Sequence, residues 1–156
     1  MGGWLELLIA LNTAVTDVFL AMAEDGQRSL LLLKMPALVM CGGSLGAASR
    51  YGVGLLAARI WGARFPWGTL IVNLTGCFFI GLLFGLADSV RFLTPEMRLL
   101  LVTGYLGALT TFSTFCLETV TAARAGLRLQ PLTNIVINNA GGLALTFLGI
   151  WLGGLG

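Results

Sequence analysis

The densest group of polar side chains in the apolar part of this sequence lies in one stretch. Residues 103–119 contain two glycines, the carboxylate of Glu118 and six Ser or Thr hydroxyls. The hydroxyls belong to Thr103, Thr110, Thr111, Ser113, Thr114 and Thr119. Other apolar stretches contribute the amides of Asn73, Asn134, Asn138 and Asn139. Neutral hydroxyls and amides can bind a small anion weakly enough to release it, as conduction requires, although the same groups also join neighbouring helices in membranes.

Two phenylalanines in this stretch, Phe112 and Phe115, are three residues apart and share one face of a helix. The edge of an aromatic ring is positive, so ring edges among hydroxyls and amides could stabilise an anion that loses its water. The simpler interpretation is that both rings fill the core or face lipid. The residues alone leave both interpretations open.

Other kinds of chemistry have little support in the sequence. There is no histidine, which is the commonest general acid or base and metal ligand. Cys41, Cys77 and Cys116 lie in apolar stretches without paired spacing, where a cysteine usually acts as a small apolar side chain. With no nucleophile and base in a recognisable pair, we do not expect an enzyme, and we expect no nucleic-acid partner.

The composition indicates an integral membrane protein. Only 10% of the 156 residues are charged, whereas soluble domains carry about 25%. Because a helix needs about 20 apolar residues to cross a bilayer, the uncharged runs predict an all-α protein with four transmembrane helices. We expect them at about 36–58, 67–87, 99–122 and 132–153.

Glycines in these spans predict two kinds of feature. Pairs four residues apart, such as Gly42/Gly46, Gly81/Gly85 and Gly149/Gly153, are typical of close helix packing in membranes. In the third span, Gly104 and Gly107 precede the pair Thr110–Thr111, which predicts a break in the helix. A break frees backbone groups that protein or an ion must satisfy.

Residues 1–34 differ from the four-helix domain expected over 35–156. They predict an interfacial amphipathic helix, whose acidic stripe would not attract anionic lipids. The apolar face comprises Trp4, Leu7, Leu8, Leu11, Val15, Val18, Phe19 and Met22, and the opposite stripe comprises Glu6, Thr13, Asp17 and Glu24. A fifth span, or a leader before a true start at Met35, is the alternative.

The positive charges do not favour one orientation in the membrane. With four spans, one side holds Arg28, Lys34, Arg91 and Arg98, and the other holds Arg59, Arg64, Arg124 and Arg128. Orientation follows a Lys and Arg imbalance in short loops, which is nil here and becomes two against four if residues 1–34 are left out. Either the count carries no information, or the chain inserts both ways and pairs with an inverted copy.

Three motifs then identify a resemblance that covers residue 37 to the C-terminus. Gly42–Tyr51 fits GGxxGAxxRY, Gly68–Phe78 fits GTLxVNxxGxF, and Gly104–Glu118 fits GxxGxxTTFSTFxxE. In order and spacing these segments resemble the CrcB/Fluc family of fluoride channels. The resemblance implies a passive fluoride-selective channel that exports cytoplasmic fluoride and reduces its toxicity. It also implies an antiparallel, dual-topology homodimer in the cell inner (plasma) membrane.

The resemblance also implies roles for single residues. The fluoride pore would be formed by Asn73, Phe112, Ser113, Thr114, Phe115 and Asn138. Arg50 would lie in an aqueous vestibule, and the backbone carbonyls of Gly107 and Thr110 from both subunits would hold a structural sodium ion. Asn134 and Asn138 stand where the family often has Tyr and Ser, and both amides can still donate hydrogen bonds.

Two other functions are weighed against a channel. A dual-topology exporter of small molecules or drugs needs a titratable carboxylate deep in its first span, but 36–58 contains no Asp or Glu. A non-transporting scaffold subunit would show packing glycines without a track of polar groups.

Overall fold

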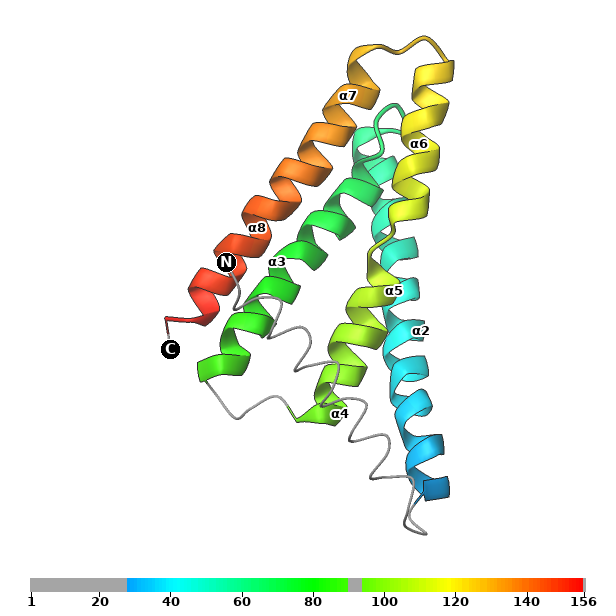
Figure 1. The fold of residues 1–156 in the computed structure, drawn as a ribbon. Helices are drawn as coiled ribbons and strands as arrows, with labels where there is room; N and C mark the ends of the chain where they lie inside the picture. Colours follow the sequence, from blue (N-terminus) through cyan, green and yellow to red (C-terminus); the bar gives the residue numbers. More distant parts are fainter. Residues whose placement is uncertain (1–27, 90–93, 156) are drawn as a thin grey trace. The chain divides into compact units, whose positions relative to one another are not determined.

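The computed structural model describes residues 28–89 and 94–155, and the regular elements among them are helices. Among these described residues, four helical stretches are long and apolar enough to cross a membrane, namely Leu32–Trp61, Trp67–Leu86, Pro95–Arg124 and Leu129–Gly153. The prediction of an all-α protein with four transmembrane helices is therefore confirmed (Figure 1).

The chain divides into two compact units, Met1–Ala37 and Leu38–Gly156. The first described helix, α2 (Arg28–Trp61), begins in the first unit. The amphipathic helix expected over residues 1–34 lies for the most part outside the described residues. The packing that forms the candidate site belongs to the second unit.

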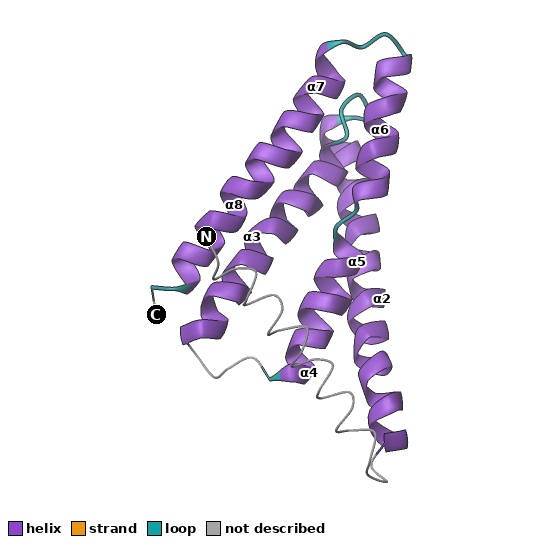
Figure 2. Cartoon of the chain, viewed as in Figure 1, coloured by secondary structure: helices purple, strands orange, loops and turns teal. Residues whose placement is uncertain are grey.

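The second transmembrane stretch is the continuous helix α3 (Trp67–Ser89), whereas the third stretch is interrupted. The third stretch comprises α4 (Pro95–Arg98), the π-helical segment η1 (Leu99–Leu106), α5 (Gly107–Leu109) and α6 (Phe112–Arg124). Between α5 and α6 the backbone is extended at Thr110 and Thr111, which Figure 2 shows as a short loop inside the helix. The predicted break in the third helix is confirmed.

The fourth stretch also contains a π-helical segment. It comprises α7 (Leu129–Val136), η2 (Ile137–Gly141) and α8 (Gly142–Gly153). A π-helix widens the turn and recurs at functional sites. Here η2 carries two asparagines, Asn138 and Asn139, at its centre.

Glycines on α3 and α8 bring these two helices together, and Figure 1 shows them side by side. A Cβ atom at Gly81 or Gly85 would collide with a carbonyl of the fourth stretch, and one at Gly149 or Gly153 with a carbonyl of α3. Small residues allow such close backbone approach in membranes. The expected packing role of both glycine pairs is confirmed, and it sets the distance between Asn73 on α3 and Asn138 just before α8.

A third glycine pair joins α2 to the third stretch. Added Cβ atoms at Gly42 and Gly46 would meet the carbonyls of Leu100 and Tyr105. The buried core lies next to this contact, where Val72 of α3 packs with Leu106 and Leu109. The first and second stretches, α2 and α3, therefore pack against the half of the third stretch that precedes the break.

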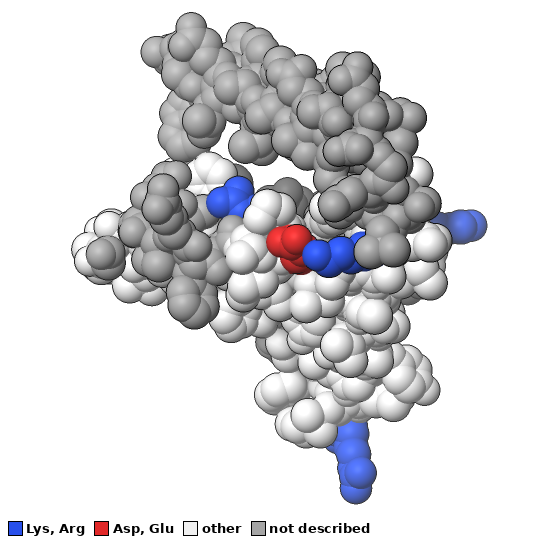
Figure 3. All heavy atoms as spheres, turned by 90° about the horizontal axis from the view of Figure 1, so that it is seen from below, with Lys and Arg blue, Asp and Glu red and all other residues white. Residues whose placement is uncertain are grey.

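Charges are sparse on the surface of the helices. On the described part of the face drawn in Figure 3, Lys, Arg and acidic side chains form isolated patches on an uncharged surface. At the turn after α2, the rings of Trp61 and Trp67 lie 6.1 Å apart and those of Phe65 and Trp67 lie 4.7 Å apart. Tryptophan prefers the boundary between membrane and water, so these rings fit an interfacial position.

Candidate functional site

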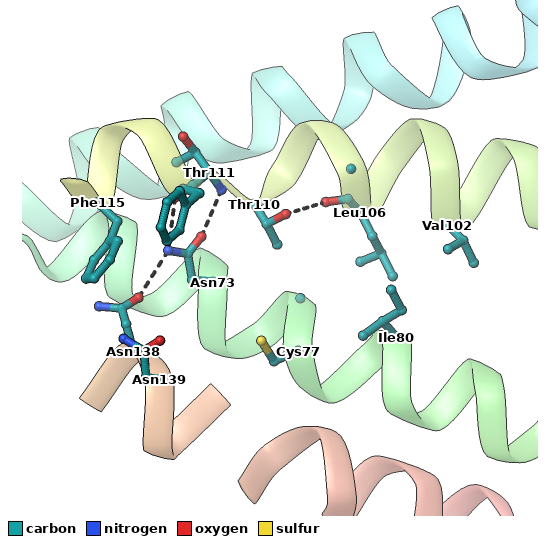
Figure 4. Close-up of a pocket in the computed structure, with 13 residues that line it drawn as sticks. Asn73, Cys77, Ile80, Val102, Leu106, Thr110, Thr111, Phe115, Asn138 and Asn139 are labelled. Atoms are coloured by element: carbon teal, nitrogen blue, oxygen red, sulfur yellow. Dashed lines mark hydrogen bonds between the residues drawn. The ribbon is translucent and has the colours of Figure 1, made fainter. Parts of the chain in front are cut away.

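The break between α5 and α6 is held by one side chain of α3. The Asn73 amide oxygen accepts a hydrogen bond from the Thr111 backbone N–H at 2.9 Å, and its amide nitrogen donates to the Thr111 carbonyl at 3.2 Å (Figure 4). One amide thus replaces the two backbone partners that Thr111 would have in a helix. Because buried backbone groups in a membrane must be paired, Asn73 stabilises the break.

Thr111 also begins the next helix. Its hydroxyl accepts a hydrogen bond from the Thr114 backbone N–H at 3.2 Å, which is the usual N-cap interaction. The same hydroxyl lies 3.1 Å from Thr114 Oγ1 and 3.3 Å from Ser113 Oγ. Ser113 and Thr114 are exposed, so the hydroxyl cluster opens away from the packed helices.

At the break, two backbone carbonyls lose the N–H donors that they would have in a continuous helix. In a continuous helix the Gly107 carbonyl would pair with the Thr111 N–H and the Thr110 carbonyl with the Thr114 N–H. Both N–H groups donate to side chains instead. The Thr110 carbonyl accepts from Nη1 of Arg50 at 3.4 Å, which places the Arg50 guanidinium at the break.

A cavity of about 350 Å³ lies beside the break. Asn73 of α3, Thr110 and Phe115 of the third stretch, and Asn138 of η2 are among the residues that line it (Figure 4). Gly107 and Phe112 also line it, whereas Ser113 and Thr114 do not. The structure therefore brings most of the expected pore residues around one space.

The two phenylalanines occupy different environments. Their ring centroids lie 5.6 Å apart with the planes inclined by 44°. Phe115 is buried at 7% exposure, whereas Phe112 is 74% exposed. Phe115 belongs to the packed wall of the cavity, and Phe112 is exposed on the surface of the chain beside the exposed hydroxyls.

Hydrogen bonds between side-chain amides connect Asn73 to the fourth stretch. Asn73 Nδ2 donates to Asn138 Oδ1 at 3.1 Å (Figure 4). Asn138 Nδ2 in turn donates to Asn134 Oδ1 at 2.9 Å. Asn134 then donates to the Thr119 hydroxyl of α6 at 2.8 Å. Asn134 is only 1% exposed, so these asparagines form an internal network.

Two further polar residues pair where the sequence analysis assigned no partner. The Thr69 hydroxyl of α3 donates to Glu118 Oε1 at 2.8 Å. Glu118 Oε2 is buried and has no hydrogen-bond partner among the described residues. The signal for this contact is the spacing of Thr69 and Asn73, which puts both on the face of α3 that meets α6.

The donor set excludes several kinds of metal site. Within residues 28–89 and 94–155, no cluster of three or more His, Cys, Asp or Glu side chains lies close enough to bind a metal ion. The cysteines among these residues are free thiols. A cation at this site would depend on backbone oxygens.

Comparison with known proteins gives concordant matches. Residues 37–150 match the family model described as CrcB-like protein, Camphor Resistance (CrcB). A Dehalococcoides mccartyi protein named fluoride-specific ion channel FluC is 43% identical over 118 residues, which cover 76% of this chain and 91% of that protein. Proteins of the same name from Legionella pneumophila (strain Paris) and Aeromonas salmonicida are 46% and 42% identical, over 71% and 73% of this chain and 83% and 91% of their own lengths.

Proposed function

The chain belongs to the CrcB family, and we propose that it is a passive fluoride-selective channel that lets cytoplasmic fluoride leave down its electrochemical gradient. Such a channel lowers internal fluoride and so reduces fluoride toxicity. The chain is a multi-pass membrane protein and not an enzyme. We place it in the cell inner membrane, because export from the cytoplasm requires a pathway across that bilayer.

One observation carries the proposal: the cavity beside the break is lined by uncharged side chains, which include amides, hydroxyls and two aromatic rings among apolar groups such as Ile80 and Leu106. None of the described residues that line it carries a charge. Amides, hydroxyls and ring edges can replace part of the water of a small anion, whereas a fixed cation would retain it. The cavity therefore suits a small anion that must pass quickly.

The direct test measures fluoride efflux from liposomes that contain the purified full-length protein. We expect fluoride to leave at least about a hundredfold faster than from protein-free vesicles, because a dehydrating path replaces the apolar barrier. Chloride loaded into the same vesicles should remain. Equal release of both ions would contradict selectivity, and no release of fluoride would contradict the channel.

We also propose that the channel is an antiparallel homodimer. Phe112, Ser113 and Thr114 are exposed beside the break, although polar groups in hydrocarbon are costly unless they face protein or water. A second copy would cover them. The equal division of Lys and Arg between the two sides suits a pair of inverted copies, since neither orientation is favoured.

Sodium is the cofactor that the family resemblance implies, and the residues present fit it. The carbonyls of Gly107 and Thr110 have lost their helical donors and lie at the C-terminal end of a half-helix, where the dipole favours a cation. The Arg50 guanidinium already donates to one of them. Bound Na⁺ would supply positive charge that holds two copies together at the break.

Gly107→Val tests the proposed contact between copies. Within its own protomer an added Cβ at Gly107 would meet only the Val102 carbonyl, at 3.7 Å, so the fold has room for a side chain. We expect the variant to fold but to dimerise about tenfold more weakly, because the bulk would separate the carbonyls of the two copies. Monomer and dimer fractions at several protein concentrations measure this.

Thr110→Ser is the matched control for Gly107→Val. It keeps the backbone and the hydroxyl, which donates to the Leu106 carbonyl at 3.1 Å, so dimerisation should stay within about twofold of the wild type. A dimeric, conducting Gly107→Val protein would contradict the carbonyl site. Loss of the dimer in both variants would point to local unfolding instead.

A further inference from the structure

A single hydrogen-bond chain begins and ends on the turn that carries the two phenylalanines. It runs from the Thr111 backbone N–H to the Phe115 carbonyl and passes through α3, η2, α7 and α6. In order, the bonds are Thr111 N to Asn73 Oδ1 (2.9 Å), Asn73 Nδ2 to Asn138 Oδ1 (3.1 Å), Asn138 Nδ2 to Asn134 Oδ1 (2.9 Å), Asn134 Nδ2 to Thr119 Oγ1 (2.8 Å) and Thr119 Oγ1 to the Phe115 carbonyl (2.7 Å).

All links of this chain point the same way. Each amide accepts through its oxygen from the preceding group and donates through its nitrogen to the next. An amide that turned over would set oxygen against oxygen or nitrogen against nitrogen, so the orientation of one group fixes that of its neighbours. Aligned hydrogen bonds of this kind also polarise and strengthen one another.

The orientation matters because an asparagine presents opposite charges at its two ends. Its NH₂ attracts an anion, and its carbonyl oxygen repels one. Asn73 and Asn138 both line the cavity. Both N–H groups of each of these amides donate within the network, so an anion that reaches Asn73 or Asn138 must replace one of those bonds, and the network sets how readily it can do so.

Asn134 and Thr119 secure the far end of the chain without lining the cavity. Asn138 Nδ2 is held twice by Asn134, through Oδ1 at 2.9 Å and through the backbone carbonyl at 3.0 Å. Asn134 is buried at 1% exposure, so water does not compete for these bonds. Thr119 anchors Asn134 to the helix that carries both phenylalanines.

We propose that Thr119 and Asn134 are positioning residues, which orient the amides of Asn138 and Asn73 and so set the rate and selectivity of anion passage. The inference rests on the proposed fluoride channel. Neither residue touches the ion. Both act through the chain of amides, which couples the fourth stretch to the break.

Thr119 allows a conservative test. Thr119→Val keeps the shape of the side chain and removes the hydroxyl, whereas Thr119→Ser keeps the hydroxyl. In liposomes with equal amounts of folded dimer, we expect Thr119→Val to slow fluoride efflux about three- to tenfold, which corresponds to the loss of one or two hydrogen bonds. It should also lower the ratio of fluoride to chloride efflux. Thr119→Ser should stay within about twofold of wild type, and Thr121→Val, an exposed position on the same helix, should have no effect.

Asn134→Leu supplies the second test, because leucine has nearly the same shape as asparagine and no hydrogen-bonding group. We expect efflux to fall about tenfold or more, since the Asn138 amide loses its oriented partner. If the chain acts as one unit, Thr119→Val combined with Asn134→Leu should be no slower than Asn134→Leu alone, because coupled residues are not additive.

The outcomes separate this inference from the proposed function. A wild-type protein that releases no fluoride contradicts the channel itself. A conducting wild type with an unchanged Thr119→Val variant, a Thr119→Ser variant as slow as Thr119→Val, or multiplicative effects in the double variant overturns the positioning role. If Asn134→Leu does not fold, the comparison of Thr119→Val with Thr119→Ser still tests the positioning role.

Discussion

Asn73→Leu is expected to slow fluoride efflux more than a hundredfold. Leucine fills nearly the same space, so the change removes hydrogen bonds without opening a cavity. Asn73 makes three of them, to the backbone N–H of Thr111, to its carbonyl and to the amide oxygen of Asn138. An unpaired buried polar group costs about 1–3 kcal/mol, and two backbone groups of Thr111 would lose their partner inside the membrane.

We expect Asn73→Leu to reduce the rate of fluoride efflux at least as strongly as it reduces the stability of the fold. Asn73 is the only residue of α3 whose side chain bonds both the break and η2 among the described contacts. Without it, Thr111 at the turn that begins α6 loses its hydrogen bonds to α3, and the cavity loses one of its amides. Fluoride efflux from liposomes, compared at equal amounts of folded dimer, measures the effect.

Thr75→Val is the matched control for Asn73→Leu. Thr75 lies on the same helix and is exposed, and it lies outside the cavity beside the break. Removal of the Thr75 hydroxyl should leave the rate of fluoride efflux within about twofold of wild type. If Thr75→Val slowed fluoride efflux as much as Asn73→Leu, the effect would be a general one on α3. Wild-type efflux in the Asn73→Leu variant would contradict the role of Asn73.

The sequence could predict the transmembrane helices and the break because both have local causes. The long uncharged run of residues 65–87 has the length a bilayer requires. Glycines followed by Thr110–Thr111 weaken a helix wherever they stand, since glycine is a poor helix former and threonine hydroxyls compete for backbone partners. The structure places the extended residues at those two positions.

The partners across the helices could not be predicted in the same way. The clamp of Asn73 on Thr111 and the contact of Arg50 with the Thr110 carbonyl depend on how α2 and α3 are rotated against the third stretch. In a soluble protein an amphipathic pattern would indicate that rotation. Helices that are apolar on all sides lack the pattern.

The separate roles of the asparagines in the fourth stretch could not be predicted from the sequence either. The spacing of Asn134 and Asn138 correctly puts both on one face of a helix, and both could serve equally as donors to an anion. The structure separates them: Asn138 lines the cavity, whereas Asn134 is buried away from it and donates to Thr119. The π-helical segment η2, which begins at Ile137 and contains Asn138 but not Asn134, has no compositional signature.

The packing of α3 on α8 links the fold to the site, and Gly149→Ala tests that link. A Cβ at Gly149 would collide with the Phe78 carbonyl and lie 2.6 Å from the Leu82 backbone nitrogen. These are backbone atoms of a helix, so only a movement of the whole of α3 can relieve the contact. We expect a destabilisation of about 3 kcal/mol, at the upper end of the cost of overpacking, and a thermal midpoint lower by about 5–10 °C.

The same movement should also damage conduction. α3 carries Asn73, and α8 continues directly from the segment that carries Asn138, so a wider separation stretches their 3.1 Å hydrogen bond. Gly52→Ala is the matched control, because an added Cβ there meets no atom within 4 Å and alanine favours a helix by about 1 kcal/mol over glycine. The thermal midpoint and the rate of fluoride efflux should both decrease in Gly149→Ala. Both should stay close to the wild-type values in Gly52→Ala. A stable Gly149→Ala protein that conducts normally would show that the distance between α3 and α8 does not control the site.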